Sequence, residues 1–212
     1  MTSPFTHLSK TPVPAAYYDR DYFVSGKKSA YGGYGPAEWT TWLTDMVVDF
    51  LKPTSVLDIG CATGPVVLYL QKRGVSCQGF DLSAWAIEHT VTPGSTWIGS
   101  AEDPAAYEGI SVDLAIASEL AEHLIPQQAK RMLQNTRGHA KRFLLLICVD
   151  MGDDADPTIG DHTHINVRPM SWWEELARKT GWTVADASRF NDDERSVRMG
   201  WAGRFLYLTQ EG

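Results

Sequence analysis

The sequence predicts one α/β domain, a three-layer sandwich of helices around a mostly parallel β-sheet, and two observations predict it. Between residues 55 and 180, short apolar segments alternate with segments whose apolar residues recur at helical spacing. Strands that alternate with helices are typical of parallel sheets with right-handed crossovers. After residue 181, two apolar segments, 182–187 and 204–209, follow each other without a helical pattern between them. We therefore expect an antiparallel pair of strands at the edge of the sheet.

The expected elements follow in order along the chain. Residues 37–51 carry apolar side chains at helical spacing, from Trp39 to Phe50, and Pro36 suits the start of a helix. We expect further helices at residues 65–72, 84–90, 127–136 and 171–180, and strands at residues 55–59, 76–81, 95–99, 112–117 and 142–149. Residues 1–36, with a tail and a Tyr- and Gly-rich loop, are expected to form a lid over the site of an α/β domain at residues 37–212.

Composition and charge exclude several classes of protein. The net charge of −7 argues against a broad nucleic-acid surface, because affinity for phosphates comes from clustered Lys and Arg. No apolar run approaches the roughly 20 residues that span a bilayer, and the first residues lack the pattern of a secretion signal. Cys61, Cys77 and Cys148 lie in apolar stretches, which favours buried thiols in a reducing compartment. We expect a cytoplasmic protein without membrane contact, either a monomer or a homodimer.

The first expected strand leads into a turn of small residues. Residues 56–64 read Val-Leu-Asp-Ile-Gly-Cys-Ala-Thr-Gly, so that the strand ends in Gly60, Ala62 and Gly64 before a helix. Small residues let a ligand approach the backbone at the carboxyl end of a strand, where open α/β sheets bind ligands. The next strand ends in Asp81, 17 positions after Gly64, where a carboxylate can accept both hydroxyls of a ribose. Together the two features predict a cofactor that contains a nucleoside.

A nicotinamide dinucleotide is the alternative that shares this geometry. Its fingerprint is Gly-x-Gly-x-x-Gly, in which the amino end of the helix holds a pyrophosphate. Here Gly60-x-Ala62-x-Gly64 is followed by Pro65, and no third glycine stands at the required position. The turn therefore disfavours a dinucleotide.

Residues 56–64 instead resemble motif I of the class I, Rossmann-like S-adenosylmethionine-dependent methyltransferases, a family in which alanine often replaces the middle glycine. The resemblance extends over residues 37–210 and implies that family's seven-stranded, mostly parallel sheet with an antiparallel edge strand. It also implies S-adenosylmethionine as co-substrate. The residues that it assigns to the cofactor lie in the turn, at the ends of the following strands and in the lid: Asp58, Gly60, Cys61, Ala62, Gly64, Asp81, Leu82, Ala101, Glu102, Ser118 and Tyr22.

The lid carries a second resemblance. Residues 18–23, Tyr-Asp-Arg-Asp-Tyr-Phe, are similar to the opening of a branch of this family that acts on sugars, glycans or natural products. In that branch the N-terminal segment folds over the cofactor, which implies Tyr22, Tyr31 and Tyr34 as lining residues, with ordinary loop packing as the alternative. Trp172 and Trp173 are candidates for the opposite wall, and one of the two is expected in the core.

Acids and histidines cluster where a methyl acceptor would lie, at the carboxyl edge of the sheet. Residues 119–123, Glu-Leu-Ala-Glu-His, follow the fourth strand, and residues 161–164, Asp-His-Thr-His, lie after the fifth. The first segment resembles the Glu-x-x-Glu-His segment of ubiquinone-pathway O-methyltransferases and plant small-RNA methyltransferases, in which two acids and two histidines hold magnesium near the accepting hydroxyl. This implies Glu119, Glu122, His123 and His164, or His162 in its place, as ligands of Mg²⁺ or another divalent cation.

A metal-free site is the alternative. His164 or His123 would then take the proton of the acceptor as a general base, and Glu119 would hold the ammonium group of the cofactor. In that case Glu122 caps a helix. The catalytic candidates are therefore Glu119, His123 and His164.

The sequence thus predicts an S-adenosylmethionine-dependent O-methyltransferase with a small-molecule or sugar-like acceptor. N-methylation of an amine or a peptide end is the alternative, because a neutral amine needs little help from a base. A cofactor-binding partner subunit without activity is a third interpretation, which the acids and histidines beside the methyl position disfavour. A nucleic-acid acceptor is also disfavoured, because a solvated helix face explains the basic residues between positions 130 and 142 as well.

Overall fold

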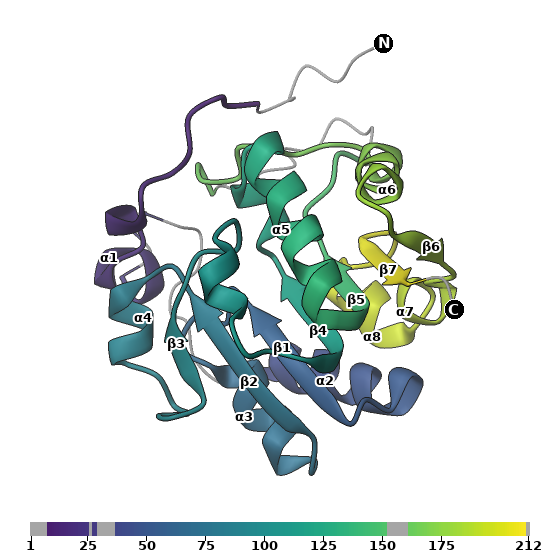
Figure 1. Cartoon of the computed structure of the whole chain (residues 1–212), viewed down its shortest axis with the longest axis horizontal. Helices are drawn as coiled ribbons and strands as arrows, with labels where there is room; N and C mark the ends of the chain where they lie inside the picture. The colour runs from purple at the N-terminus through teal and green to yellow at the C-terminus, as the bar shows by residue number, and fades with distance from the viewer. Residues whose placement is uncertain (1–7, 26, 29–36, 152–160, 211–212) are drawn as a thin grey trace.

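The computed structural model describes residues 8–25, 27–28, 37–151 and 161–210. Its centre is a seven-stranded sheet in the order β3-β2-β1-β4-β5-β7-β6 (Figure 1). β7 runs antiparallel to β5 and β6, and the other pairs of neighbours are parallel. The predicted mostly parallel sheet with an antiparallel pair at its edge is confirmed. The strands are β1 (Ser55–Ile59), β2 (Ser76–Asp81), β3 (Thr96–Ile98), β4 (Val112–Ser118), β5 (Ala140–Leu146), β6 (Thr183–Ala185) and β7 (Phe205–Thr209).

Helices cover both faces of the sheet. In Figure 1, α2 and α3 lie against one face, and α5 and α6 lie against the other. The α-helices are α1 (Arg20–Phe23), α2 (Glu38–Leu51), α3 (Pro65–Lys72), α4 (Ala84–Glu88), α5 (Pro126–His139), α6 (Met170–Lys179), α7 (Ser188–Asn191) and α8 (Glu194–Met199). Three short 3-10 helices accompany them: η1 (Ala15–Tyr17), η2 (Pro104–Tyr107) and η3 (Ala121–His123). None of the helices in the described part of the chain has the length and apolar character needed to cross a membrane.

Alternate residues of the central strands pack on opposite sides of the sheet. In β4, Leu114 and Ile116 join the apolar cluster under α2 and α3, whereas Ala115 and Ala117 join the cluster under α5 and α6. Both faces of β4 are therefore apolar, as is usual for a strand inside a parallel sheet. Each fully buried Leu or Ile side chain stabilises the fold by roughly 1.5–3 kcal/mol.

Two short helices, α7 and α8, lie between β6 and β7. The sequence predicted two strands joined without a helix, and that prediction was wrong. Asp193 caps α8 by accepting a hydrogen bond of 2.9 Å from the Arg195 backbone N–H, and Gly200 ends the helix with φ of 71°. These caps define α8, whereas α7 has no side-chain cap at its start. Helices of four and six residues are too short to display helical periodicity.

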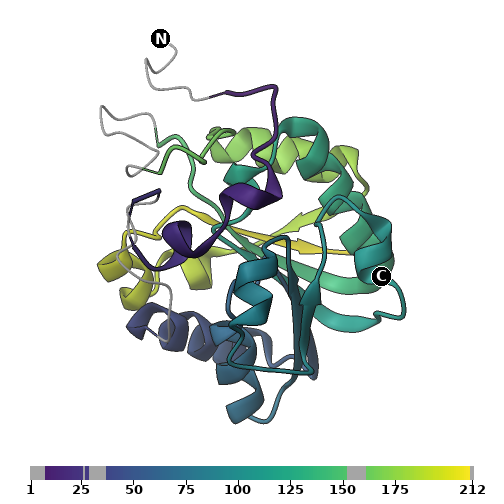
Figure 2. The same ribbon diagram turned by 90° about the vertical axis from the view of Figure 1, so that its left-hand side faces the viewer.

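The N-terminal segment crosses the edge of the sheet that carries the strand ends, and Figure 2 shows it in purple in front of that edge. Asp19 begins α1 by accepting hydrogen bonds of 3.0 and 3.3 Å from the backbone N–H groups of Asp21 and Tyr22. Tyr22 and Phe23 are buried against Ala62 after β1. The expectation that this stretch would be loop rather than core was wrong for these two residues, because a short capped helix turns their rings inward.

Candidate active site

A cavity of about 420 Å³ opens at the carboxyl edge of the sheet. Its walls come from the turn after β1, the ends of β2 and β4, the segment after β3, the lid helix α1 and the residues just before β7. The volume lies in the range of ligand and cofactor sites. This position, outside the carboxyl ends of the strands, is where open α/β sheets bind ligands.

The turn after β1 is shaped by backbone conformations that favour glycine. Gly60 and Gly64 have φ of 77° and 81°, and a Cβ at Gly64 would lie 2.5 Å from Thr92 Oγ1. Ala62 between them also has a positive φ, 49°. The backbone N–H of Ala62 donates a hydrogen bond of 2.8 Å to Asp81, which helps to hold this conformation. The turn therefore presents backbone rather than side chains to a ligand.

Asp81 connects the end of β2 to the turn. One carboxylate oxygen accepts from the Ala62 N–H, and the other accepts from the Ser83 N–H, each at 2.8 Å. A carboxylate oxygen can accept more than one hydrogen bond, so both remain able to accept from ribose hydroxyls. Burial raises the pKa of Asp81, and these two backbone hydrogen bonds lower it.

Asp58 adds a second carboxyl group to the cavity wall. Burial raises its pKa to about 7, with a smaller contribution from the negative charge of Asp81. A positively charged ligand group would relieve both effects. The cavity therefore suits a molecule with a ribose and a cationic group, such as S-adenosylmethionine.

Most residues assigned to the cofactor lie on the cavity wall, and two do not. The wall includes Asp58, Gly60, Cys61, Ala62, Asp81, Leu82, Ala101, Ser118 and Tyr22. Gly64 is the N-cap of α3 instead. Glu102 is turned to α5, where its carboxylate accepts hydrogen bonds of 2.6 Å from Gln128 and 2.9 Å from Arg131. Tyr31 and Tyr34 lie outside the described residues.

Glu119 lies on the cavity wall in a rare backbone conformation. Its φ is 50°, and its backbone N–H donates to Leu146 O at 2.8 Å across the ends of β4 and β5. A non-glycine residue held at positive φ is often found at a functional site. Burial raises the pKa of Glu119, whereas interactions with Glu122 and the positive charge of Arg204 lower it.

Glu122 is fully buried behind Glu119. Its Oε1 accepts a hydrogen bond of 3.1 Å from the Cys148 backbone N–H. Burial and the neighbouring Glu119 raise the pKa of Glu122 well above its usual value. The pair therefore holds less negative charge than two exposed glutamates.

His123 begins a chain of hydrogen bonds that runs away from the cavity. Its Nδ1 lies 2.8 Å from Thr163 Oγ1, and Thr163 Oγ1 lies 2.6 Å from Asp161 Oδ1. A carboxylate can only accept, so the Thr163 hydroxyl donates to Asp161, and Nδ1 of His123 carries the proton that Thr163 accepts. This assignment leaves Nε2, on the other side of the ring, with its lone pair.

The buried carboxylate of Asp161 receives three hydrogen bonds. They come from Thr163 Oγ1, from the Thr163 backbone N–H at 2.8 Å and from the Tyr22 hydroxyl at 3.0 Å. Tyr22 lines the cavity, so the lid, the cavity and the hydrogen-bonded chain from His123 meet at one point. Burial and the neighbouring His164 lower the pKa of His123 to about 3, although Asp161 and backbone hydrogen bonds to Thr163 and Glu119 raise it. His123 is therefore neutral near pH 7.

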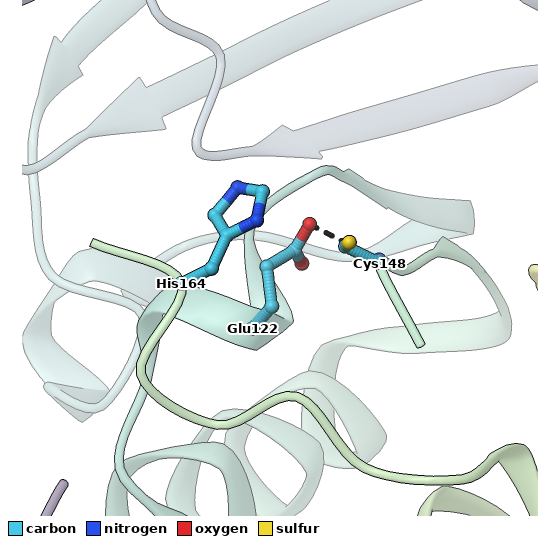
Figure 3. Close-up of side chains that lie close together, drawn as sticks. All are labelled: Glu122, Cys148 and His164. Carbon is cyan, nitrogen blue, oxygen red and sulfur yellow. Dashed lines mark hydrogen bonds between the residues drawn. The ribbon is translucent and has the colours of Figure 1, made fainter. Parts of the chain in front are cut away.

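His164 is buried behind His123, with 4.7 Å between the ring centroids, and it does not line the cavity. His162 is exposed. Figure 3 shows the carboxylate of Glu122 pointing toward Cys148, with the ring of His164 beside it. Of these three histidines, only His123 lines the cavity.

The predicted metal ligands do not form one group. In the described part of the chain, possible ligand atoms gather within 4.8 Å in two sets, Glu122–Cys148–His164 and His123–Asp161–His164. Neither set contains Glu119. Of the four predicted ligands, the first set contains Glu122 and His164, and the second contains His123 and His164. The residues present do not fit the predicted four-ligand arrangement, and a divalent cation stays a prediction.

Sequence reasoning missed several residues of the wall. They are mostly apolar or aromatic and include one cation: Tyr18, Trp39, Met199, Trp201 and Arg204. The last three precede a strand that was expected to be antiparallel, and the amino end of such a strand lies at the carboxyl edge of its parallel neighbours. That topology was the available signal. Trp172 and Trp173 do not line the cavity, and Trp173 lies in the core as expected for one of the pair.

Comparison with known proteins agrees with this geometry. A family model described as a methyltransferase domain matches residues 31–187. No match to the sequence was found among curated proteins.

Solved structures share the fold at low sequence identity. An O-methyltransferase family protein from Burkholderia thailandensis is 16% identical with a TM-score of 0.59, and the match covers 82% of this chain and 56% of that one. A plantazolicin methyltransferase in complex with a triazolic analogue and S-adenosylhomocysteine is 16% identical with a TM-score of 0.56, and the match covers 81% of this chain and 83% of that one. Magnesium protoporphyrin IX methyltransferase from Synechocystis with bound S-adenosylhomocysteine is 17% identical with a TM-score of 0.60, and the match covers 84% of this chain and 90% of that one.

The family match covers more than half of the chain, and the sheet order, the glycine turn and the acid after β2 are all present. The chain therefore belongs to the methyltransferase domain family, as an S-adenosylmethionine-dependent methyltransferase of the Rossmann-like fold.

Proposed function

We propose that the protein transfers the methyl group to a hydroxyl oxygen of a small molecule, with His123 as the general base. The observation that carries this proposal is the chain His123–Thr163–Asp161, with distances of 2.8 and 2.6 Å, which begins at the cavity wall. Such a chain fixes the tautomer and the orientation of a histidine, as a base that acts on a hydroxyl requires. A subunit that only binds the cofactor has no use for it.

Charge balance supports the role of His123. When bound, S-adenosylmethionine supplies a methyl group on a positively charged sulfonium, and the sulfur keeps the electron pair of the broken bond as a neutral thioether. The acceptor oxygen forms the new bond to carbon, and its proton passes to Nε2 of His123. One positive charge disappears as another forms, so a buried site of low dielectric gains no net charge. Asp161, through Thr163, stabilises the imidazolium that results.

The acids of the wall favour oxygen over nitrogen as the accepting atom. Asp58, Asp81 and Glu119 all line the cavity. Nearby carboxylates raise the pKa of an amine, and a protonated amine has no lone pair with which to attack. These carboxylates are suited instead to the ribose and the ammonium group of the cofactor. The carboxylates of the wall therefore do not help the methylation of an amine.

The acceptor is proposed to be small because the cavity is limited and lined with rings. Tyr18, Phe23, Trp39 and Trp201 contribute aromatic surface, which packs against a planar body or the face of a sugar ring. Two of the similar structures are a plantazolicin methyltransferase in complex with a triazolic analogue and magnesium protoporphyrin IX methyltransferase, and both names contain a small molecule.

The test compares His123→Gln with wild type, with His89→Gln as the matched control because His89 is exposed and lies outside the cavity wall. Purified protein is supplied with S-adenosylmethionine and a panel of hydroxylated aromatics and sugars, and S-adenosylhomocysteine is quantified. We expect His123→Gln to lower kcat by roughly 10²–10⁴-fold while the Kd for S-adenosylhomocysteine stays within twofold of wild type. A kcat within twofold of wild type would refute the role of His123.

A further inference from the structure

Arg204 is a cation beside the place where a cationic methyl donor must react. Among the described residues that line the cavity, Arg204 is the one Lys or Arg side chain. The wall also contains His123, which is neutral because burial lowers its pKa to about 3. A guanidinium near a sulfonium is unfavourable unless an anion separates the two charges.

The backbone fixes Arg204 at the end of the cavity beside β4 and β5, which we call the acceptor end. Its carbonyl oxygen accepts a hydrogen bond of 3.1 Å from the Ile147 N–H, and its own N–H donates to Trp201 O at 2.9 Å. The preceding residue of β5, Leu146, accepts from the N–H of Glu119. Arg204 therefore stands at the ends of β4 and β5, away from the ribose-binding acid at the end of β2.

No protein carboxylate among the described residues forms an ion pair or a hydrogen bond with the Arg204 guanidinium. Glu119 is near enough for its pKa to be lowered by the charge of Arg204, although burial raises that pKa more strongly. The planar donor fork of Arg204 thus remains able to bind a ligand, and a carboxylate matches it with two parallel hydrogen bonds.

The segment just before Arg204 adds apolar and aromatic side chains to the cavity wall. Trp39 and Trp201 line the cavity with their rings in an edge-to-face arrangement, 6.4 Å between centroids, and Met199 lies beside them. Aromatic rings and a thioether favour a flat apolar body. The wall therefore combines one anion-binding group with an apolar face.

We propose that Arg204 binds a carboxylate at the acceptor end of the cavity, and that the acceptor is an acid whose carboxylate is joined to a planar apolar body carrying the hydroxyl. This inference rests on the proposed function, since it names the class of acceptor for the same site. The same carboxylate chemistry has a second source, the methionine part of the cofactor. The experiment separates the two sources.

The test measures binding by wild type, Arg204→Met and Arg204→Lys. Arg198→Met is the matched control, because the Arg198 guanidinium lies 4.9 Å from the Trp42 ring centroid and outside the cavity wall. In the first arm, calorimetry compares S-adenosylhomocysteine with methylthioadenosine, which lacks the amino-acid part. In the second arm, protein saturated with S-adenosylhomocysteine is titrated with hydroxybenzoate and hydroxynaphthoate isomers and with their amides, and ligand-observed NMR gives each Kd.

We expect wild type to bind at least one acid tenfold or more tightly than its amide, Arg204→Met to abolish that preference, and Arg204→Lys to retain part of it. A tenfold loss of S-adenosylhomocysteine affinity in Arg204→Met, with methylthioadenosine unaffected, would support the carboxylate site but assign it to the cofactor and overturn the acidic acceptor. The carboxylate site is overturned if Arg204→Met changes neither the preference for an acid over its amide nor the preference for S-adenosylhomocysteine over methylthioadenosine. Because no arm requires methyl transfer, these results are independent of the turnover assay that tests His123.

Discussion

The hydroxyl of Tyr22 donates a hydrogen bond of 3.0 Å to Asp161 Oδ2, which joins the lid to the loop after β5. Both residues are buried, and Tyr22 also lines the cavity. The same carboxylate is bonded through Thr163 to His123. Hydrogen bonds therefore connect the N-terminal segment to the group that is proposed to take the proton.

Tyr22→Phe removes this hydrogen bond and keeps the ring. We expect the variant to lose about 1.5–3 kcal/mol of unfolding free energy, the usual contribution of a hydrogen bond to a charged group, and to bind S-adenosylhomocysteine several-fold more weakly. Tyr17→Phe is the control, because Tyr17 neighbours Tyr22 without lining the cavity. Urea unfolding and calorimetry measure the two quantities. Equal losses in both variants would contradict the link between lid and loop.

Thr163 is expected to set the tautomer of His123. In wild type, ¹⁵N NMR of the imidazole should show a proton on Nδ1 and no titration of His123 above pH 5, because burial lowers its pKa to about 3. Thr163→Val removes the acceptor of that proton and should shift the population toward the Nε2–H form, whereas Thr163→Ser should behave as wild type. A proton on Nε2 in wild type would contradict the proposed role of His123 as a base.

Asp58 is expected to make the stability of the ligand-free protein depend on pH. Burial raises its pKa to about 7 in the folded state, whereas in the unfolded chain it is about 4. As the pH rises from about 4 to about 7, the unfolded chain releases this proton first, so the free energy of unfolding falls by at most about 1.4 kcal/mol per pH unit. Urea unfolding of wild type and Asp58→Asn at several pH values measures this. Parallel curves for the two proteins would show that Asp58 does not titrate in this window.

Gly64 and Gly74 form a matched pair for the turn after β1. Both have a positive φ, 81° and 79°, but a Cβ at Gly64 would lie 2.5 Å from Thr92 Oγ1, whereas a Cβ at Gly74 would meet nothing within 4 Å. Gly74→Ala should cost about 1–2 kcal/mol for the left-handed conformation alone, and Gly64→Ala should cost more. The difference, measured by thermal or urea unfolding, reports the close packing of the turn. Equal costs would mean that Thr92 moves away freely.

Local chemistry explains which parts of the fold could be predicted from the sequence. The helix at Pro65–Lys72 and the strand Ser55–Ile59 have the predicted bounds, because proline at a helix start and a short, mostly apolar strand are local signals. β5 runs from Ala140 to Leu146, so it begins two residues before and ends three residues before the predicted strand at 142–149. The exposed Lys141 at its start lies outside the apolar run on which the prediction depended. α7 and α8 were missed because helices of four and six residues are too short to show a periodic apolar face.

Residues of the cavity wall could be predicted to lie together where they are close in sequence. Gly60, Ala62 and Asp81 follow two consecutive strands, so topology alone brings them together. Tyr22 was assigned to this cavity through the resemblance of residues 18–23, and it lines the wall. Arg204 reaches the same cavity from the other end of the chain, and no local pattern marks its position there. The separation of Glu119 from His164 depends on side-chain packing behind the wall, which spacing cannot reveal.

The central claim is that the cavity holds S-adenosylmethionine with Asp81 on its ribose. Calorimetric titration of S-adenosylhomocysteine into wild type and Asp81→Asn, with NAD as the control ligand, tests this most directly. Asp81→Asn keeps the shape of the side chain but replaces one acceptor oxygen with an NH₂ donor. The account predicts saturable one-to-one binding by wild type, at least tenfold weaker binding by Asp81→Asn, and no binding of NAD. Absence of S-adenosylhomocysteine binding by folded wild type, or tighter binding of NAD, would contradict it.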